Sequence, residues 1–183
     1  MKRIIFITGS VRSGKSDLAV RLAKERSKKV VFLATCKPAD DEMRERVDKH
    51  KKERPKDWGT IEEEKEIASV IANSKADQTI IIDCLTLWIS NLLMSGLTEQ
   101  EIKEKIGELI DALQKTYSTT ILVSNEVGWG IVPENKIARM FRDIMGRLHQ
   151  RIGCVSDEVY LVVSGIPMTI KGENLHEKNG PYY

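Results

Sequence analysis

A glycine-rich segment near the N-terminus has the residue types and the spacing of a phosphate-binding loop. It matches G-x-x-x-x-G-K-[ST] in full, between an apolar run at residues 4–7 and a helical pattern expected to begin at Asp17. Glycines let the backbone turn its N–H groups inward, and the following helix adds the positive end of its dipole. The motif consists of Gly9, Ser10, Val11, Arg12, Ser13, Gly14, Lys15 and Ser16. We therefore expect nucleoside triphosphate binding, with Lys15 at the β- and γ-phosphates and the Ser16 hydroxyl on Mg²⁺.

A second candidate for this chemistry is Asp83, which directly follows the isoleucine run at residues 80–82. In phosphate-loop proteins a carboxylate at the carboxyl end of a buried strand organises the Mg²⁺ ion. The alternative is an ordinary strand-end residue, but a charge after three isoleucines needs a partner, which favours the metal role. Ligands of open α/β sheets gather at the carboxyl ends of the strands. Thr35, Asp83 and residues 124–126 are therefore expected to face the same crevice as the loop.

The elements that position these residues follow from the hydrophobic pattern. Apolar runs alternate with helical patterns, which is typical of parallel strands buried on both faces. Thr98 and Glu101 form a predicted capping box at the start of one helix. The expected strands lie at 4–7, 30–34, 79–82, 120–123 and 159–163, with an edge strand at 166–170, and the expected helices carry the apolar positions of 18–23, 102–113 and 137–148. We predict one α/β domain over residues 1–171, with a mostly parallel sheet flanked by helices, and a C-terminal tail over 172–183.

Composition narrows the choice of partner and compartment. The 183 residues include 29 basic and 27 acidic side chains, so no strongly basic field points to nucleic acid or a membrane surface. No apolar stretch approaches the length of a membrane span, and the first residues form a core strand instead of a signal peptide, so we expect a cytoplasmic protein with a small-molecule partner. Cys36, Cys84 and Cys154 are far apart and are expected to be buried thiols, neither a metal site nor a disulfide framework.

Histidine and arginine residues supply further candidates. His50 falls on one face of a predicted helix over residues 40–54, among cations that favour its neutral, nucleophilic form and suit polyphosphate binding. From composition alone, a surface position is the alternative. The arginines of the helix over 137–151 are expected to form a solvated face instead of a phosphate clamp. His149, on that helix, and His176, in the tail, lie near no motif in the sequence.

Taken together, these segments resemble one family, the bifunctional adenosylcobinamide kinase/adenosylcobinamide-phosphate guanylyltransferases of cobalamin biosynthesis. The phosphate loop alone indicates only a superfamily. The segment D-D-E-M…H at residues 40–50 and the segment N-E-V-G-x-G-I-V-P-E-N at 125–135 are far more specific. The resemblance also covers residues 34–35, 54–62, 83–86 and 139–151, and so spans nearly the whole chain.

The resemblance implies two reactions and the residues that carry them. ATP or GTP would phosphorylate adenosylcobinamide, with Lys15, Ser16, Asp83 and Mg²⁺ handling the phosphates. His50 would then accept GMP from GTP, release pyrophosphate and pass the guanylyl group to adenosylcobinamide phosphate, giving adenosylcobinamide-GDP. The family further implies a RecA-like P-loop core, a homotrimer and a set of nucleotide-site residues beyond the loop: Ala34, Thr35, Lys51, Lys52, Glu53, Arg54, Glu62 and Asp83.

The chain departs from the family pattern at two places. The loop begins Gly9-Ser10-Val11-Arg12 where the family often has Gly-Gly-Ala-Arg, and Trp129 stands where a smaller or aliphatic residue is expected. Neither change touches the implied chemistry, although Trp129 between two glycines could reshape a lid or a subunit contact. Two other functions stay open from the residues themselves: a monofunctional small-molecule kinase with a structural His50, and a nucleotide-switched binding module whose mobile element is the segment 128–130.

Overall fold

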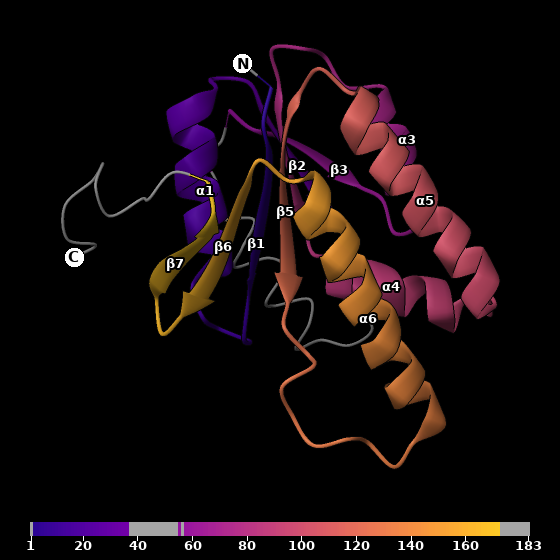
Figure 1. Ribbon diagram of the computed structural model, residues 1–183. Helices are drawn as coiled ribbons and strands as arrows, with labels where there is room; N and C mark the ends of the chain where they lie inside the picture. The colour runs from indigo at the N-terminus through magenta and orange to yellow at the C-terminus, as the bar shows by residue number, and fades with distance from the viewer. Residues whose placement is uncertain (1, 37–54, 56, 173–183) are drawn as a thin grey trace.

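The protein is built around a sheet whose strands place the predicted site at one edge. The computed structural model describes residues 2–36, 55 and 57–172, and this part of the chain forms a seven-stranded sheet in the order β3-β2-β4-β5-β1-β6-β7 (Figure 1). All neighbouring strands pair in parallel except β7, which is antiparallel to β6. The strands are β1 (Ile4–Gly9), β2 (Val30–Ala34), β3 (Gly59–Glu62), β4 (Thr79–Asp83), β5 (Thr119–Asn125), β6 (Glu158–Val163) and β7 (Ile166–Lys171).

The strand order decides which residues can meet. β1, which leads into the phosphate loop, lies between β5 and β6, and β5 separates it from β4, which ends in Asp83. In this register Gly9 pairs with Asn125, and Val123 pairs with Asp83. The carboxyl ends of β1, β5 and β4 therefore lie side by side, as the sequence predicts for a crevice at this edge.

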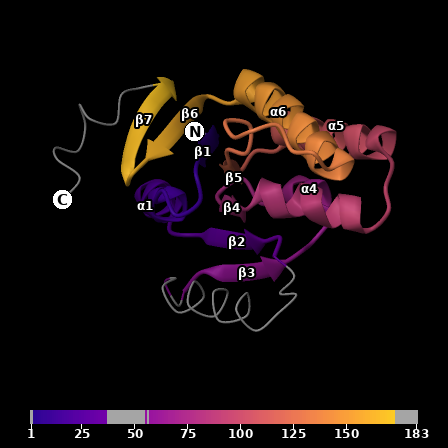
Figure 2. The same cartoon turned by 90° about the horizontal axis from the view of Figure 1, so that it is seen from below.

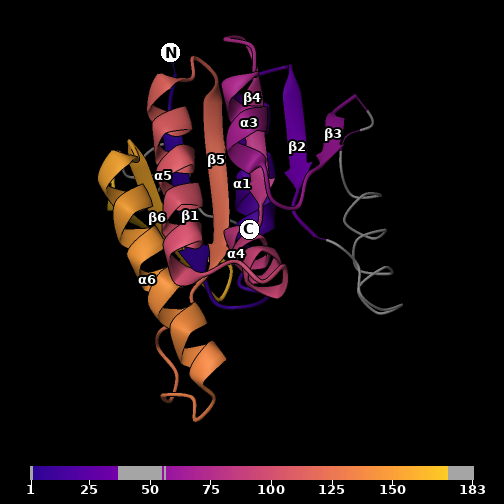
Figure 3. The ribbon, with the colours of Figure 1, turned by 90° about the vertical axis from the view of Figure 1, so that its right-hand side faces the viewer.

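Helices cover both faces of the sheet. Figure 2 shows α1 on one face and α4, α5 and α6 on the other, and Figure 3 shows α3 alongside α5. The helices within the described residues are α1 (Lys15–Arg26), α3 (Ile67–Ala72), α4 (Leu85–Met94), α5 (Glu99–Lys115) and α6 (Lys136–Val155). Among the described residues, no helix combines the length and the apolar character that crossing a membrane requires.

Alternation along the strands explains why two cores form. Ile5 and Ile7 pack with α1 in one hydrophobic cluster, whereas Ile4 and Phe6 pack with the helices of the opposite face in another. Successive side chains of a strand point to opposite faces, so a strand covered on both sides reads as a continuous apolar run. The prediction of buried parallel strands is confirmed by this arrangement.

One predicted helix start is confirmed by the structure, and another lies two residues from its predicted position. The capping box is present, because the Thr98 hydroxyl accepts from the backbone N–H of Glu101 and the Glu101 carboxylate accepts from that of Thr98. α1, however, begins at Lys15, two residues before the expected start. In α6 the predicted apolar stripe is buried only from Ile144 onward, because Ile137 lies in the first turn and is 63% exposed.

Candidate nucleotide-binding site

The phosphate loop joins β1 to α1 through backbone conformations that favour inward-facing N–H groups. Gly9, Arg12 and Gly14 have φ angles of 151°, 57° and 95°. Gly14 is the N-cap of α1 and makes no side-chain cap hydrogen bond, which leaves the first N–H groups of the helix for a ligand. A helix N-terminus reached through such a turn is suited to binding an anion.

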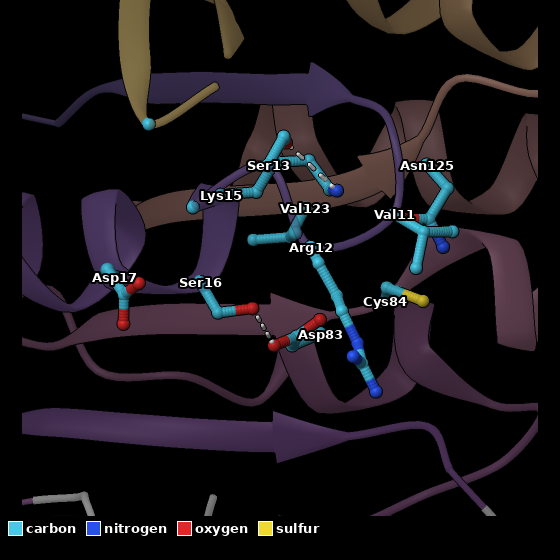
Figure 4. A pocket seen from close by; sticks show the side chains of 12 residues that line it. Val11, Arg12, Ser13, Lys15, Ser16, Asp17, Asp83, Cys84, Val123 and Asn125 are labelled. Atoms are coloured by element: carbon cyan, nitrogen blue, oxygen red, sulfur yellow. Dashed lines mark hydrogen bonds between the residues drawn. The ribbon is translucent and has the colours of Figure 1, made fainter. Parts of the chain in front are cut away.

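Lys15 supplies a positive charge that is shielded from water. Its side chain is buried, and Nζ donates to the Ser10 carbonyl oxygen at 2.6 Å and lies 3.5 Å from Ser13 Oγ (Figure 4). Burial lowers the pKa of Lys15 from its ordinary value, and the nearby Asp83 carboxylate opposes that shift. Because a charge acts more strongly where water is excluded, this ammonium group is well placed to hold phosphate.

The two predicted Mg²⁺ ligands lie next to each other. Ser16, in the first turn of α1, donates from Oγ to Asp83 Oδ2 at 2.9 Å, so the hydroxyl and the carboxylate meet across the sheet edge (Figure 4). Mg²⁺ prefers oxygen ligands and usually takes one or two from the protein while keeping waters and phosphate oxygens. The residues present therefore fit the ion, and their role as ligands stays a prediction.

A cavity of about 410 Å³ connects these groups. The sequence motif accounts for six of its lining residues, Val11 to Ser16, and Asp83 is a seventh. The remaining lining residues are Asp17, Cys84, Val123, Asn125 and Gly165. Gly165 lies in the turn between β6 and β7, and its N–H donates to the Ser13 carbonyl oxygen at 2.9 Å. The hairpin thus forms a wall of the cavity that no local sequence pattern indicates.

The family of the chain follows from comparison with known proteins. Residues 5–170 match the family described as cobinamide kinase / cobinamide phosphate guanyltransferase. The chain belongs to this family. It is 41% identical to the bifunctional adenosylcobalamin biosynthesis protein CobU of Salmonella typhimurium, covering 92% of this chain and 99% of the relative. It is 39% identical to the corresponding protein CobP of Pseudomonas aeruginosa, covering 92% and 98%.

A solved structure with a similar fold supports this assignment of the architecture. The flagellar accessory protein FlaH of Methanocaldococcus jannaschii superposes with a TM-score of 0.51 at 14% identity, over 93% of this chain and 79% of that one. At that identity the likeness concerns the fold alone. It confirms the predicted fold, an α/β domain with a mostly parallel sheet flanked by helices.

Other residues predicted for the nucleotide site lie elsewhere or outside the described residues. Thr35 does not line the cavity, because its hydroxyl donates to the Cys84 carbonyl oxygen at 2.8 Å and accepts from the Cys84 N–H at 2.9 Å. Ala34 pairs with Asp83 on one side and with Glu62 on the other, at the carboxyl ends of β4 and β3. His50 and residues 51–54 lie outside the described residues, between β2 and β3 in the sequence.

Two expectations about single residues are wrong. The three cysteines are not all buried: Cys84 is, but Cys36 is half-buried and Cys154 is exposed, because Cys154 lies on the solvent side of α6. His149 is not remote from a motif, since its Nε2 lies 2.8 Å from Ser124 Oγ at the end of β5. Sequence distance conceals this contact, which depends on α6 packing across the strand.

The arginines of α6 support the segment that follows β5. Arg139 donates to the Pro133 carbonyl oxygen at 2.9 Å, and Arg142 donates to that of Ile131 at 3.4 Å. This segment extends beyond the sheet between β5 and α6 (Figure 1). Arg139 is exposed and Arg142 is half-buried; both hold backbone carbonyls, and neither lines the phosphate cavity.

Proposed function

We propose that this chain phosphorylates adenosylcobinamide with ATP or GTP and then transfers GMP from GTP to the product, giving adenosylcobinamide-GDP. The observation that carries the proposal is the constellation of Lys15, Ser16 and Asp83 around one cavity in a chain of the cobinamide kinase / cobinamide phosphate guanyltransferase family. The similar proteins CobU and CobP are named as bifunctional, which supports two reactions on one chain.

In the kinase step the chain acts by holding the triphosphate in place. Lys15 and the N–H groups of residues 13–16 would bind the β- and γ-phosphates, and Ser16 with Asp83 would hold Mg²⁺. When bound, the ion neutralises charge on the phosphate oxygens. The hydroxyl oxygen of adenosylcobinamide then bonds to the γ-phosphorus, the bond from that phosphorus to the β-phosphate oxygen breaks, and the hydroxyl proton passes to water. Positioning and electrostatics supply most of the rate enhancement in such reactions.

In the second step His50 would act as a nucleophile. A neutral ring nitrogen bonds to the α-phosphorus of GTP and pyrophosphate leaves. A phosphate oxygen of adenosylcobinamide phosphate then bonds to the same phosphorus, and the histidine nitrogen leaves. We propose that residues 51–54, with Ala34, Thr35 and Glu62, form the guanine nucleotide site, because the segment 35–58 starts at the carboxyl end of β2, next to Asp83.

Covalent labelling tests this assignment directly. Wild-type protein incubated with α-labelled GTP should retain label after denaturing electrophoresis, and the label should be acid-labile and alkali-stable, as a phosphorus–nitrogen bond requires. His50→Asn should lose the label while still phosphorylating adenosylcobinamide, since that step needs no protein nucleophile. His176→Asn is the matched control and should label normally. An unlabelled wild-type protein would instead favour one of the two open alternatives, the monofunctional kinase or the nucleotide-switched module.

We further propose that the enzyme is a cytoplasmic homotrimer of one catalytic domain, residues 1–171, with a tail at 172–183. Trp129, Ile131 and Val132 are 76%, 95% and 60% exposed, and apolar side chains gathered in this way favour a contact with another surface. Sedimentation equilibrium should give three times the chain mass. A monomer mass at micromolar concentration would exclude the trimer and leave the two reactions unaffected.

A further inference from the structure

A row of polar side chains lies behind the carboxyl end of β5, on the side away from α1. It runs from Thr86 on α4 through Ser124 on β5 to His149 on α6, with 3.3 Å between the two hydroxyl oxygens and 2.8 Å from Ser124 Oγ to His149 Nε2. Ser124 is fully buried and the His149 side chain is 13% exposed. Buried polar groups are costly unless they are paired, so each member of the row depends on the next.

One end of the row contacts a residue in the wall of the nucleotide cavity, and the other end contacts the residue that follows it in the chain. The backbone N–H of Asn125, a lining residue, donates to Thr86 Oγ1 at 2.8 Å. At the other end His149 Nδ1 lies 3.6 Å from Glu126 Oε2, and the backbone N–H of Glu126 donates to the carbonyl oxygen of Gly9 at 2.9 Å. The His149 ring thus contacts the residues immediately before and after Asn125.

One arrangement of protons satisfies every contact in the row. When the proton of a neutral His149 is on Nδ1, it faces the Glu126 carboxylate. Nε2 then accepts a hydrogen bond from the Ser124 hydroxyl. Ser124 Oγ is then free to accept from Thr86, whose oxygen in turn accepts the Asn125 N–H. Burial favours the neutral ring by lowering the pKa of His149, although Glu126 opposes that shift.

Packing alone does not explain this histidine. Its ring does contact Phe6, with centroids 5.2 Å apart, and an apolar side chain could fill that space equally well. What an apolar side chain could not do is hold a buried hydroxyl and a carboxylate that is only 20% exposed. Glu126 also accepts the Gly128 N–H at 2.7 Å, so the contact from His149 reaches the first turn of the segment beyond β5.

We infer that His149 is a positioning residue for nucleotide binding: by holding Ser124 and Glu126 it fixes Asn125 and the end of β1 at the wall of the phosphate cavity. The inference rests on the proposed function only in that the bound ligand is a nucleoside triphosphate. It assigns a role to a helix residue that lies 24 positions from Asn125 in the sequence, and it requires no contact between His149 and the ligand.

Two substitutions separate positioning from packing. In His149→Gln the side-chain amide oxygen can take the place of Nε2 and accept from the Ser124 hydroxyl, whereas His149→Leu fills the space and leaves the two hydroxyls of Ser124 and Thr86 one acceptor short. Glu126 then keeps its contact with the Gly128 N–H and loses the one from the ring. A buried hydroxyl that lacks an acceptor costs enough to displace the end of β5, and small displacements at a phosphate site are expensive. We expect His149→Leu to raise the dissociation constant of a fluorescent triphosphate analogue and the KM for the triphosphate about tenfold, and His149→Gln to recover most of that loss.

The matched control is Leu148→Ala, which removes a fully buried neighbour on the same helix without touching the row. It should lower the melting temperature at least as much as His149→Leu and leave nucleotide affinity within twofold of wild type when measured well below melting. Unchanged affinity in His149→Leu, no recovery in His149→Gln, or an equal loss in Leu148→Ala would overturn the inference. Absent kinase activity in the wild type would refute the proposed function, while the affinity measurements would still test His149.

Discussion

Lys15→Met should separate the stability of the protein from its function. Lys15 is buried, and burial lowers its pKa. Its Nζ donates a hydrogen bond to the Ser10 carbonyl oxygen. Methionine keeps most of the side-chain volume without the charge. The substitution loses a hydrogen bond from a charged group, which contributes about 1.5–3 kcal/mol, and relieves the desolvation of a buried cation, so the two effects oppose each other. The free energy of unfolding of the ligand-free protein should therefore change by no more than about 1 kcal/mol.

Nucleotide binding should respond very differently. A hydrogen bond to a charged group contributes about 1.5–3 kcal/mol, and 1.4 kcal/mol corresponds to a factor of ten in affinity. Loss of the Lys15 ammonium group should weaken triphosphate binding by roughly 10- to 150-fold and impair both half-reactions, because the proposed function assigns the same loop to each. Isothermal titration and thermal melting measure the two quantities on the same sample.

The same substitution at an exposed position of the same helix, Lys24→Met, is the control and should leave affinity unchanged. A pH series adds a second check. Because folding lowers the pKa of Lys15, the unfolded chain binds more protons between that value and the ordinary value of 10.5, so the free energy of unfolding rises with pH there. Lys15→Met should lose this slope. The argument fails if Lys15→Met destabilises the ligand-free protein by more than about 2 kcal/mol, or if affinity survives.

Two further predictions concern the start of the phosphate loop and one residue of the cavity wall. In Gly9→Ala the new Cβ would lie 2.3 Å from the Val162 carbonyl oxygen at a φ of 151°, so we expect a loss of about 3 kcal/mol or more and a fall in melting temperature of roughly 6–12 °C. Gly107→Ala, in the open interior of α5, should gain about 0.5–1 kcal/mol instead, and equal melting temperatures for the two variants would contradict the clash. Burial raises the pKa of Cys84 to about 11, so iodoacetamide at pH 8 should modify the exposed Cys154 and spare Cys84 until the protein is unfolded. Peptide mass mapping that finds a modified Cys84 in the native protein would refute this prediction.

The sequence predicts the fold wherever burial leaves a local pattern. Strands covered on both faces appear as apolar runs, which is why β1, β2, β4, β5 and β6 could be located before the structure was known. β3 could not be located, because all four of its residues are exposed and an exposed edge strand carries no apolar signature. α4 leaves no clear pattern in the sequence for the opposite reason. It buries Leu85, Trp88, Ile89 and Leu92 among further apolar residues, so its polar face is too narrow to give a clear helical period.

The residues of the candidate site also fall into two groups, those that a local sequence pattern predicts and those that only the strand order places there. The phosphate loop could be predicted because its function depends on eight consecutive residues, and Asp83 because a buried strand ends there. Gly165 and Val123 could not, since their place in the cavity depends on β1 lying between β5 and β6. Thr35 shows the limit of arguing from strand ends alone. It follows the correct end of β2, but its hydroxyl is held by the backbone of Cys84 and does not face the cavity.

The position of β5 also predicts which perturbations should affect one reaction and which should affect both. β5 lies between the strand that leads into the phosphate loop and the strand that ends in Asp83, and it pairs with each of them. A displaced carboxyl end of β5 therefore alters both walls of the phosphate cavity together. Our proposal places the triphosphate of both half-reactions in that cavity, so His149→Leu should slow adenosylcobinamide phosphorylation and guanylyl transfer by similar factors. His50→Asn, by contrast, should abolish only guanylyl transfer. If a variant at His149 impaired one reaction alone, the two triphosphates would not share this cavity.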